Sequence, residues 1–474
     1  MNRRTAKIEY AEAEAAVAIL SERSALKAVP FRRMVMFAVM AAAIVVASLV
    51  DLPRTRQSGS MTWLGAITVA QSVVGVVALL FVEHAPTRVV KLVALFGAFV
   101  LWAALSIIWA PPRNEGLQNA AVYLAFTVLL TLSAAATAGF RPQVERVIGT
   151  SMVMVDVIAL SLVVASMVFR GWPTDPQAWF VHARALALFG LVPLSWHLAR
   201  WMHGNARSAL SAGLWVVALF VSLSRAATGI ALVLVVLALR VRARSGRAVL
   251  PSRLLLLSLV PLAFAAALTV KPFRERLFFP IGRDASTSTF QLRDNGRMIM
   301  WRIVARSALE APIVGKGLGS SESVVSAEYE WTGHPHNEYL RVWHDLGMVG
   351  LSLLLAAFVL SWRALWTDWC RRRRRAEELE PTLQLAALGA LLALLLGMLT
   401  DNSLVYNFVM APTAVLVGAG LGAGLGASSP RHHRRKMRRD ATRSTPSNPS
   451  DGVGDHEADT LTLPLRVRKD PPRR

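Results

Sequence analysis

The predicted membrane topology of the whole chain depends on the stretch Ser208–Arg240, SALSAGLWVVALFVSLSRAATGIALVLVVLALR. This stretch is apolar throughout, except for small polar residues, Arg225 near its middle and Arg240 at its end. As a single helix it would be about 50 Å long, which is too long for a hydrocarbon layer about 30 Å thick without strong tilt. We therefore predict a hairpin of two helices that turns at Ser224-Arg225.

The rest of the chain has the same apolar character. Hydrophobic residues make up 54% of it and charged residues 17%, with a mean hydropathy of +0.44, whereas about a quarter of a soluble chain is charged. Because a lone segment in lipid must satisfy its own backbone hydrogen bonds, we predict an all-α, polytopic integral membrane protein with about 12 transmembrane helices. The apolar segments lie near 34–51, 61–82, 89–109, 118–137, 147–169, 183–199, 208–223, 227–240, 254–270, 346–366, 382–401 and 404–424.

Charge supports the hairpin. The net charge of +22 would suggest nucleic acid in a soluble protein, but here the basic residues lie between apolar blocks. With the hairpin, the basic loops after 240 and after 366 and the basic tail all fall on the side of the N-terminus. The positive-inside rule makes that side the cytoplasm and places Arg225 at the outer surface.

The predicted organisation follows from this topology. We expect a cytoplasmic segment 1–33 with a polar helix over 8–28, transmembrane helices over 34–270, a large periplasmic loop 271–345 containing short helices, transmembrane helices over 346–424, and a disordered basic cytoplasmic tail 425–474. The only cysteine, Cys370, excludes an intramolecular disulfide.

The loop 271–345 has an uneven charge. From Lys271 to Lys316 it carries nine Lys and Arg against four acids, and from Gly317 to Asp345 one Arg against five acids. A basic half beside an acidic half suits a site that holds an anionic donor and activates a hydroxyl. A solvated loop of mixed charge is the simpler alternative.

Two motifs lie in the basic half of this loop. The first, Asp294-Asn295-Gly296, predicts a helix start, and an apolar stripe is expected to follow at Met298, Trp301, Ala305 and Ala308. The second, Gly315-Lys316-Gly317-Leu318-Gly319, could cradle a phosphate through backbone N–H groups. Since no strand precedes it, a turn packed close to the membrane is favoured.

The acidic half ends in His334-Pro335-His336-Asn337. Pro335 suits the first turn of a helix, and a helix N-terminus keeps a nearby imidazole neutral. His336 could then accept a proton from a sugar hydroxyl, while Asn337 could orient the acceptor or cap the helix. A surface cap without chemistry, or a metal bound by both histidines, are the alternatives.

Several motifs resemble the bacterial O-antigen ligase and O-antigen polymerase family. His336-Asn337 is followed after nine residues by Gly347-Met348-Val349-Gly350, which is the spacing of that family. Other parts of the pattern recur in Trp102–Trp109, Ser224–Gly229, Gly296-Arg297 with Trp301, and Pro312–Gly317. The resemblance covers about residues 90–425, and the chain departs from the pattern at Ala226, where glycine is common.

This resemblance implies a GT-C-like, inverting glycosyltransferase of the bacterial inner membrane that needs no metal or other cofactor. It would move a glycan from an undecaprenyl-pyrophosphate carrier to an acceptor hydroxyl of lipid A-core or another surface acceptor, on the periplasmic side. Arg225 and Arg297 would bind the pyrophosphate and His336 would be the catalytic base. A polysaccharide polymerase using the same donor is the first alternative.

Possible supporting residues are Asn337, Arg302 and Asp156. Asp156 falls in the middle of the segment 147–169, where an ionised carboxylate is unfavourable, so it is either paired structurally or assists the arginines. Two other classes remain open from the sequence, a transporter or flippase of lipid-linked sugars and a non-catalytic membrane partner. A transporter is disfavoured because the chain shows no internal repeat.

Overall fold

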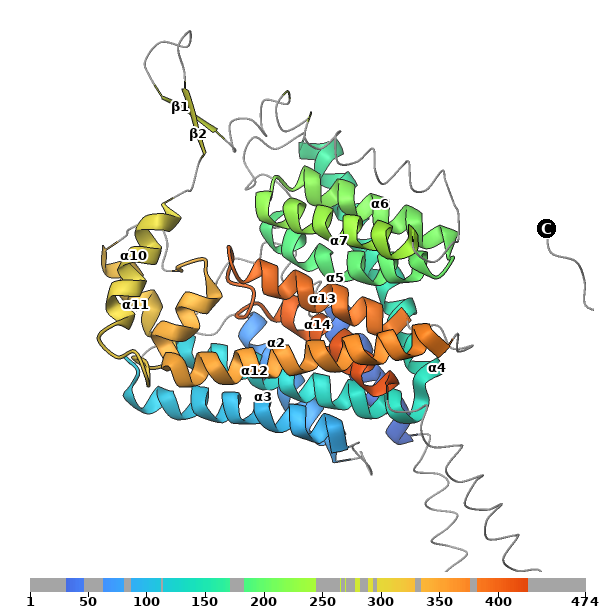
Figure 1. Ribbon diagram of the computed structural model, residues 1–474, viewed down its shortest axis with the longest axis horizontal. Coiled ribbons are helices and arrows are strands. Elements are labelled where there is room, and N and C mark those ends of the chain that lie inside the picture. Colours follow the sequence, from blue (N-terminus) through green and yellow to red (C-terminus); the bar gives the residue numbers. More distant parts are fainter. Residues whose placement is uncertain are drawn as a thin grey trace, which may run out of the picture. The chain divides into compact units, whose positions relative to one another are not determined.

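Helices account for nearly all of the described structure (Figure 1). The computed structural model describes residues 31–46, 63–80, 87–111, 114–170, 183–243, 278–281, 289–292, 296–328, 334–375 and 382–424, and positions 265 and 269. Residues 31–46 are helical. The elements that follow are α2 (Trp63–Leu79), α3 (Thr87–Ser106), η1 (Ile107–Trp109), α4 (Asn114–Arg170), α5 (Ala183–Met202), α6 (Ala206–Val221), α7 (Arg225–Ala243), β1 (Phe278–Ile281), β2 (Thr289–Leu292), α10 (Arg297–Ala308), α11 (Ser320–Glu328), α12 (Glu338–Arg375), α13 (Thr382–Gly397) and α14 (Asn407–Ala423).

The C-terminal helix α14 forms the centre of the core, because every residue from Asn407 to Ala423 is buried. Its glycines face α4 at very short range. A Cβ on Gly418 would lie 2.2 Å from the carbonyl oxygen of Leu130, and one on Gly422 would lie 2.1 Å from that of Ala134. Small residues four apart let two helix backbones approach closely, which is a common way of packing helices in membranes.

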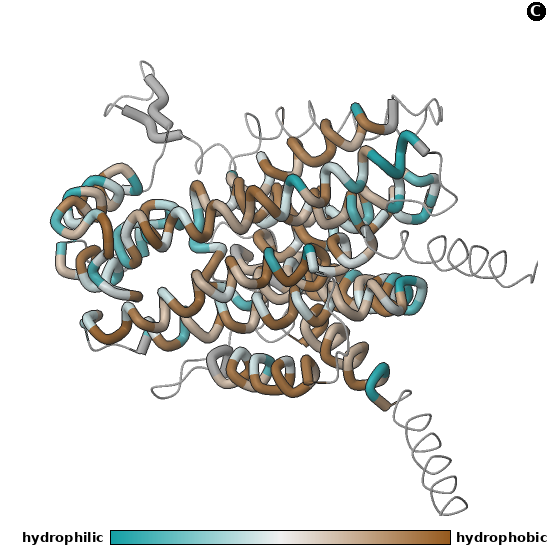
Figure 2. Tube along the Cα trace, turned by 60° about the horizontal axis from the view of Figure 1, so that its bottom comes forward, coloured by the Kyte–Doolittle hydropathy of each residue, from teal (hydrophilic) through white to brown (hydrophobic). Residues whose placement is uncertain are grey.

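The outer faces of the helices are apolar, as expected for a membrane protein. Figure 2 shows hydrophobic residues along the bodies of the helices. Large aliphatic side chains such as Val73, Leu101 and Val157 are exposed, and exposed apolar surface on this scale indicates a lipid or protein contact. Among the described residues, Thr87–Trp109, Glu115–Phe169 and Glu338–Arg374 are long and apolar enough to cross a membrane, and four shorter apolar helices accompany them.

The hairpin predicted at 208–240 is present. Helix α6 ends at Val221 and α7 begins at Arg225. The turn between them contains Leu223 in the left-handed region (φ 58°), and the hydroxyl of Thr228 donates to the carbonyl of Leu219 across the turn. A single straight helix over this stretch is therefore excluded.

Other predicted boundaries need correction. The helices predicted on either side of 138–146 are both present, and a sharp break joins them within α4 instead of a long loop. At this break Phe140 has non-helical dihedral angles (φ −137°, ψ 41°) two residues before Pro142. Proline has no N–H to donate to the preceding turn and its ring clashes with the carbonyl four residues earlier, so the first helix ends near Phe140 and the second begins directly after it. The run Arg371–Arg375, expected in a loop, continues α12.

The segment 271–345 contains a feature that was not predicted, an antiparallel ribbon in which Phe278–Ile281 of β1 pairs with Thr289–Leu292 of β2. The helix predicted after Gly296 is present as α10. The expected span 254–270 lies outside the described residues, apart from the two positions noted above, and so do the N-terminal helix 8–28 and the tail from 425 onward.

Helix α12 begins at Glu338, earlier than the predicted start at 346, and bends at Gly347 (φ 64°, ψ −172°). Its first turns and its long apolar part are therefore two helices joined by a glycine. The backbone of 312–317 crosses this bend, where the N–H of Met348 donates to the carbonyl of Pro312 at 2.9 Å and that of Gly317 to the carbonyl of Asp345 at 2.8 Å.

We expect Gly347→Ala to destabilise the protein. A Cβ at this position would lie 2.1 Å from the carbonyl oxygen of Ile313, and the positive φ disfavours any residue with a side chain. The strain at φ alone is about 1–3 kcal/mol. The thermal unfolding midpoint of the protein in detergent should fall by several degrees.

Gly213→Ala is the matched control, since nothing lies within 4 Å of a Cβ there and alanine favours the helix. Equal midpoints for the wild type, Gly347→Ala and Gly213→Ala would contradict the glycine-dependent bend.

Candidate functional site

The turn before α12 carries the predicted base, His336. Asn337 is the residue before the helix and its Oδ1 accepts from the N–H of Leu340 at 3.1 Å, so it caps α12. Pro335 therefore lies outside the first helical turn, contrary to expectation. His336 adopts a left-handed backbone conformation (φ 54°), which turns the chain into the helix and leaves the imidazole beside the helix N-terminus.

His336 faces the turn between α13 and α14. Its Nδ1 lies 3.0 Å from Nδ2 of Asn402 and 3.9 Å from Oδ1 of Asp401. The imidazole is 12% exposed, and both partners are buried. The backbone N–H of Asn402 donates to Oδ1 of Asp401 at 2.8 Å, which holds the two side chains as one unit. The carboxylate of Asp401 and the amide of Asn402 therefore both approach Nδ1 of the imidazole.

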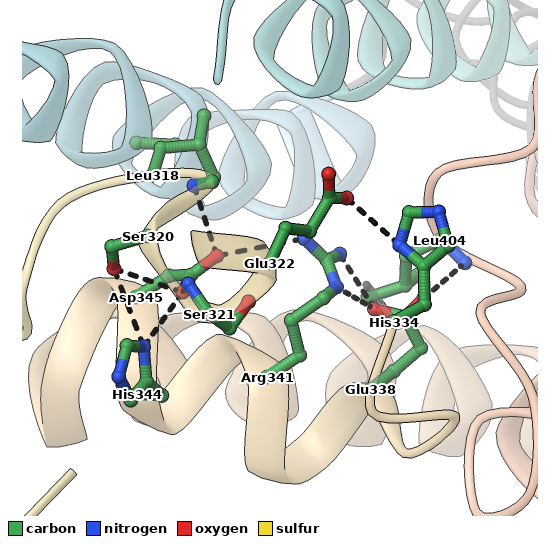
Figure 3. A network of polar contacts seen from close by, with 12 residues as sticks. Leu318, Ser320, Ser321, Glu322, His334, Glu338, Arg341, His344, Asp345 and Leu404 are labelled. Atoms are coloured by element: carbon green, nitrogen blue, oxygen red, sulfur yellow. Dashed lines mark hydrogen bonds and ion pairs between the residues drawn. The ribbon is translucent and has the colours of Figure 1, made fainter. Parts of the chain in front are cut away.

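Glu338 fixes these two turns against each other. Its backbone N–H donates to the carbonyl of Met398 at 2.8 Å, and its Oε1 accepts from the N–H of Leu404 at 3.3 Å. Its Oε2 accepts from Nε of Arg341 at 2.6 Å, and Arg341 also donates to the hydroxyl of Tyr123 on α4 at 2.5 Å. Figure 3 shows Glu338 in contact with Arg341 and Leu404. Because Glu338 and Arg341 are both buried, the position of His336 relative to 398–404 is set by the core.

Helix α10 supports the same turn from another side. The indole N–H of Trp301 donates to the carbonyl of Pro335 at 2.8 Å. Arg297 is the first residue of this helix and precedes Trp301 by four residues, so both lie on one face of α10. The structure thus brings the predicted residues Arg297 and His336 to the same part of the molecule.

The buried face of α10 differs from the predicted stripe. Met300, Val304, Ser307 and Ala308 are buried, whereas Met298 is exposed. The helix packs on α12 about one residue out of the expected register. Arg302 is exposed and lies about 140° around the helix from Arg297, so the two arginines do not share a face.

The glycine-rich segment 315–319 is a turn packed on α12, as the sequence favoured. Its backbone N–H groups are already bonded within the chain. Lys316 donates to the carbonyl of His344, Gly317 to that of Asp345, Leu318 to the hydroxyl of Ser106, and Gly319 to the carboxylate of Asp345. These groups are therefore not available to cradle a phosphate.

A second buried network anchors this turn, as Figure 3 shows. Nδ1 of His344 lies 2.9 Å from Oδ1 of Asp345, and Nε2 of His344 lies 3.0 Å from the hydroxyl of Ser307 on α10. Lys316 donates to the same hydroxyl at 2.9 Å and to the exposed Glu310 at 2.5 Å, which lowers the pKa of the Glu310 carboxyl. The network joins α10 and the glycine-rich turn to the part of α12 that precedes the bend at Gly347.

Arg225 lies at the same end of the helical bundle as His336. The hydroxyl of Thr382, at the start of α13, lies 3.4 Å from Nδ1 of His203, at the end of α5. The starts of α6 and α13 therefore lie at the same end of the bundle. Each of these helices is 16 residues, or about 24 Å, long. The turn before Arg225 and the turn containing Asp401 therefore both lie at the opposite end.

Asp156 has a structural pairing, one of the two roles predicted for it. Its Oδ1 accepts from the indole N–H of Trp215 at 2.6 Å, and its Oδ2 lies 2.8 Å from Nε2 of His197. All three side chains are buried between α4, α5 and α6. These contacts satisfy the carboxylate within the core and join it to none of the residues around His336.

The second histidine of the motif has a different partner. Nδ1 of His334 lies 2.9 Å from Oε1 of Glu322, a residue of α11. Within the described part of the chain, no three His, Cys, Asp or Glu side chains are grouped so as to hold a metal ion.

Two residues of the site, Asp401 and Asn402, were missed by the sequence reasoning. The available signal was a polar stretch, Thr400-Asp401-Asn402-Ser403, between two apolar segments that carry no other charge. A carboxylate next to a membrane span is a candidate functional group, and the predicted boundaries placed this one inside the end of a span.

Comparison with known proteins agrees with the motifs. Residues 210–355 match a family model described as O-antigen ligase. This region includes Arg225, Arg297 and His336, but neither Asp156 nor Asp401. A protein of Rickettsia conorii, whose name assigns it provisionally to the polysaccharide ligases, is 36% identical over 70 residues. That match covers 12% of this chain and 17% of the relative. Residues 210–355 thus match the O-antigen ligase family, and the resemblance predicted from the motifs is confirmed.

Proposed function

We propose that this protein is a membrane glycosyltransferase that moves a glycan from an undecaprenyl-pyrophosphate carrier to a hydroxyl of lipid A-core or another surface acceptor. The observation that carries the proposal is the position of His336, held by Asn402, Glu338 and the Trp301 contact at the end of the bundle where Arg297 and Arg225 also lie. The family description and the name of the relative both specify a ligase, and this favours a ligase over a polymerase.

In the proposed reaction, His336 takes the proton of the acceptor hydroxyl as the oxygen attacks the anomeric carbon. The new glycosidic C–O bond forms as the bond from that carbon to the pyrophosphate oxygen breaks, so the lipid pyrophosphate leaves with one more negative charge. A single displacement of this kind inverts the anomeric centre. General-base assistance contributes about 10²–10⁴-fold to such reactions.

Arg225 and Arg297 are proposed to stabilise the departing pyrophosphate. Guanidinium groups stay protonated and bind phosphate oxygens in pairs, so they can neutralise developing charge without a divalent cation. Arg225 begins α7 and Arg297 begins α10, and the partial positive charge of each helix N-terminus adds to that of the side chain. The apolar outer faces of the helices would allow the polyprenyl tail to remain in the bilayer.

The proposal also requires an orientation in the membrane. We propose that residues 271–345 face the periplasm and that both termini are cytoplasmic, because the basic loops and the tail then share the cytoplasmic side. The site at the start of α12 is then on the periplasmic face of the inner membrane. A lipid-linked sugar transporter is disfavoured. Among the described residues at the end of the bundle that carries His336, the buried charged side chains already form ion pairs or cap helices.

Cysteine labelling tests the orientation. In a Cys370→Ser background, Ser286→Cys should react with an impermeant thiol reagent in intact cells, and Ser447→Cys should react only after the membrane is opened. Labelling at position 447 alone in intact cells would reverse the topology and put the site on the wrong side.

Substitution of the arginines tests donor binding. Arg225→Ala and Arg297→Ala should each lower transfer strongly, since a charge-assisted contact is worth about 1.5–3 kcal/mol, or one to two decades in rate. Arg→Lys should restore little, because the paired contact is lost. Transfer is measured with purified protein in nanodiscs and a lipid-linked donor.

Arg306→Ala is the matched control for this experiment. Arg306 is exposed and lies about 180° around α10 from Arg297, so its loss should leave transfer unchanged. Full activity in both lysine variants would show that charge alone suffices and would contradict the paired contact.

The role of His336 is tested in the same assay. His336→Ala should lose about 10²–10⁴-fold in transfer while donor binding persists, because the arginines are intact. His334→Ala should have a milder effect, since His334 is paired with Glu322 away from Asn402. EDTA should have no effect. Loss of wild-type transfer in EDTA together with equal failure of both histidine variants would instead indicate a metal centre.

A further inference from the structure

The turn 309–314, which follows α10, presents apolar side chains at the surface. Ile313 is 66% exposed, and Leu309 and Val314 are exposed as well. In η1, which is hydrogen-bonded to the residue directly after this turn, Ile108 is 81% exposed. Large apolar side chains exposed together mark a contact with lipid or with another protein. We call these four residues, Ile108, Leu309, Ile313 and Val314, the apolar patch.

The turn lies at the depth where α12 becomes apolar. The backbone N–H of Met348 donates to the carbonyl of Pro312 at 2.9 Å, and that of Val349 donates to the carbonyl of Ile313 at 3.2 Å. Met348 and Val349 are themselves exposed, and they begin the apolar part of a helix that is long enough to cross a membrane. Ile313 is therefore level with the first turn of that membrane span.

Two tryptophans tie η1 and α3 to the same level. The indole N–H of Trp109 donates to the carbonyl of Gly315 at 3.3 Å, and that of Trp102 donates to the carbonyl of Leu346 at 2.9 Å. The two indole rings meet edge to face, with their centroids 5.8 Å apart. Tryptophan is enriched where a bilayer meets water, because its ring is apolar and its N–H needs a polar partner. The pair thus marks the edge of the hydrocarbon layer beside the turn.

The apolar face of η1 continues along α3. Leu101 and Leu105 are exposed and lie on the same side of the chain as Ile108, since the three positions follow the helical repeat. Together α3 and η1 are long and apolar enough to cross a membrane. The exposed apolar side of a membrane span therefore leads directly into the apolar patch. This continuity favours lipid over a protein partner as the occupant of the patch.

The backbone of the turn also suits an apolar surrounding. Non-helical backbone at membrane depth is tolerated only where protein groups satisfy its hydrogen bonds. The carbonyls of Pro312, Ile313 and Gly315 all accept hydrogen bonds from α12 or η1. Pro312 has no N–H to satisfy, and its carbonyl accepts a second bond from the indole N–H of Trp343 at 3.2 Å. A turn surrounded by water would not need these partners.

We propose that the turn 309–314 and η1 are inserted into the bilayer leaflet on the side of His336, with the apolar patch in contact with lipid. Part of the segment 271–345, expected to lie in the periplasm, is then a shallow membrane anchor. The anchor is independent of the orientation of the chain and of glycosyl transfer.

Charged residues limit the depth of the insertion. Glu310 comes three residues before Ile313, its side chain is exposed, and it forms an ion pair with Lys316. Because an ionised carboxylate is unfavourable in hydrocarbon, this pair lies among the headgroups or in water. The chain thus passes from the headgroups into the hydrocarbon within one turn. Since α10 precedes the turn directly, the anchor holds this helix, which begins with Arg297, at the membrane surface.

Nitroxide labels measure the depth directly. In a Cys370→Ser background, Ile313→Cys and Ile108→Cys are each labelled, and the protein is placed in nanodiscs that hold a single copy. Collision of the label with oxygen, which concentrates in hydrocarbon, is compared with collision with a nickel chelate, which stays in water. Both labels should collide readily with oxygen and be shielded from nickel.

Two reference positions calibrate this measurement. Val359→Cys is the lipid reference, since Val359 is exposed in the apolar part of α12. Ser326→Cys is the matched reference in water, because Ser326 is exposed on α11 (Ser320–Glu328) in the same segment of the chain as the turn. The labels at 313 and 108 should resemble the label at 359 and differ from the label at 326.

Two results would overturn the anchor. Collision with nickel equal to that at Ser326 would show that the patch faces water and awaits a protein partner. Shielding from both reagents would show that protein covers the patch in place of lipid. The substituted side chains are exposed, thermal unfolding shows whether each labelled protein is folded, and either label alone decides the result. Loss of transfer activity has no bearing on this measurement, so the anchor and the proposed function are tested separately.

Discussion

The buried pair of Glu338 and Arg341 is the interaction on which the rest of the site depends. Glu338 uses one carboxylate oxygen to bind the guanidinium and the other to bind the backbone at Leu404, while Arg341 reaches Tyr123 on α4. The pair thus joins three parts of the chain that are far apart in sequence. Removing one member of a buried ion pair leaves an unpaired charge and typically costs 3–5 kcal/mol. The pair fixes the geometry here, and that geometry places His336 against Asp401 and Asn402.

The bend at Gly347 explains how one segment serves both the site and the bilayer. Before the bend, α12 carries polar residues that make the networks around Glu338 and Asp345, and after it the helix is apolar and long. Gly315 and Gly347 permit the backbone of 312–317 to lie directly on the bend, where any Cβ would collide with a carbonyl. Gly315 and Gly347 are therefore explained by close backbone contact.

Much of this arrangement could be predicted from the sequence, for physical reasons. Apolar segments have to be helical in lipid, so all of those that fall in the described residues were located, and the length of 208–240 was enough to require a hairpin. The spacing from His336 to Gly350 identified the turn that carries the candidate base.

The predictions failed where tertiary contacts decide the outcome. The short connection between the two helices around Pro142 and the buried side of α10 depend on neighbouring helices, which periodicity does not report. Asp401 and Asn402 were missed because their contact with His336 joins residues separated by more than 60 positions.

The most direct test of the central claim is a structure of the protein in nanodiscs with an undecaprenyl-pyrophosphate glycan bound. The pyrophosphate is predicted to lie between Arg225 and Arg297, with the anomeric carbon facing the imidazole of His336. A pyrophosphate bound at the other end of the bundle, beside Arg371–Arg375, would contradict it.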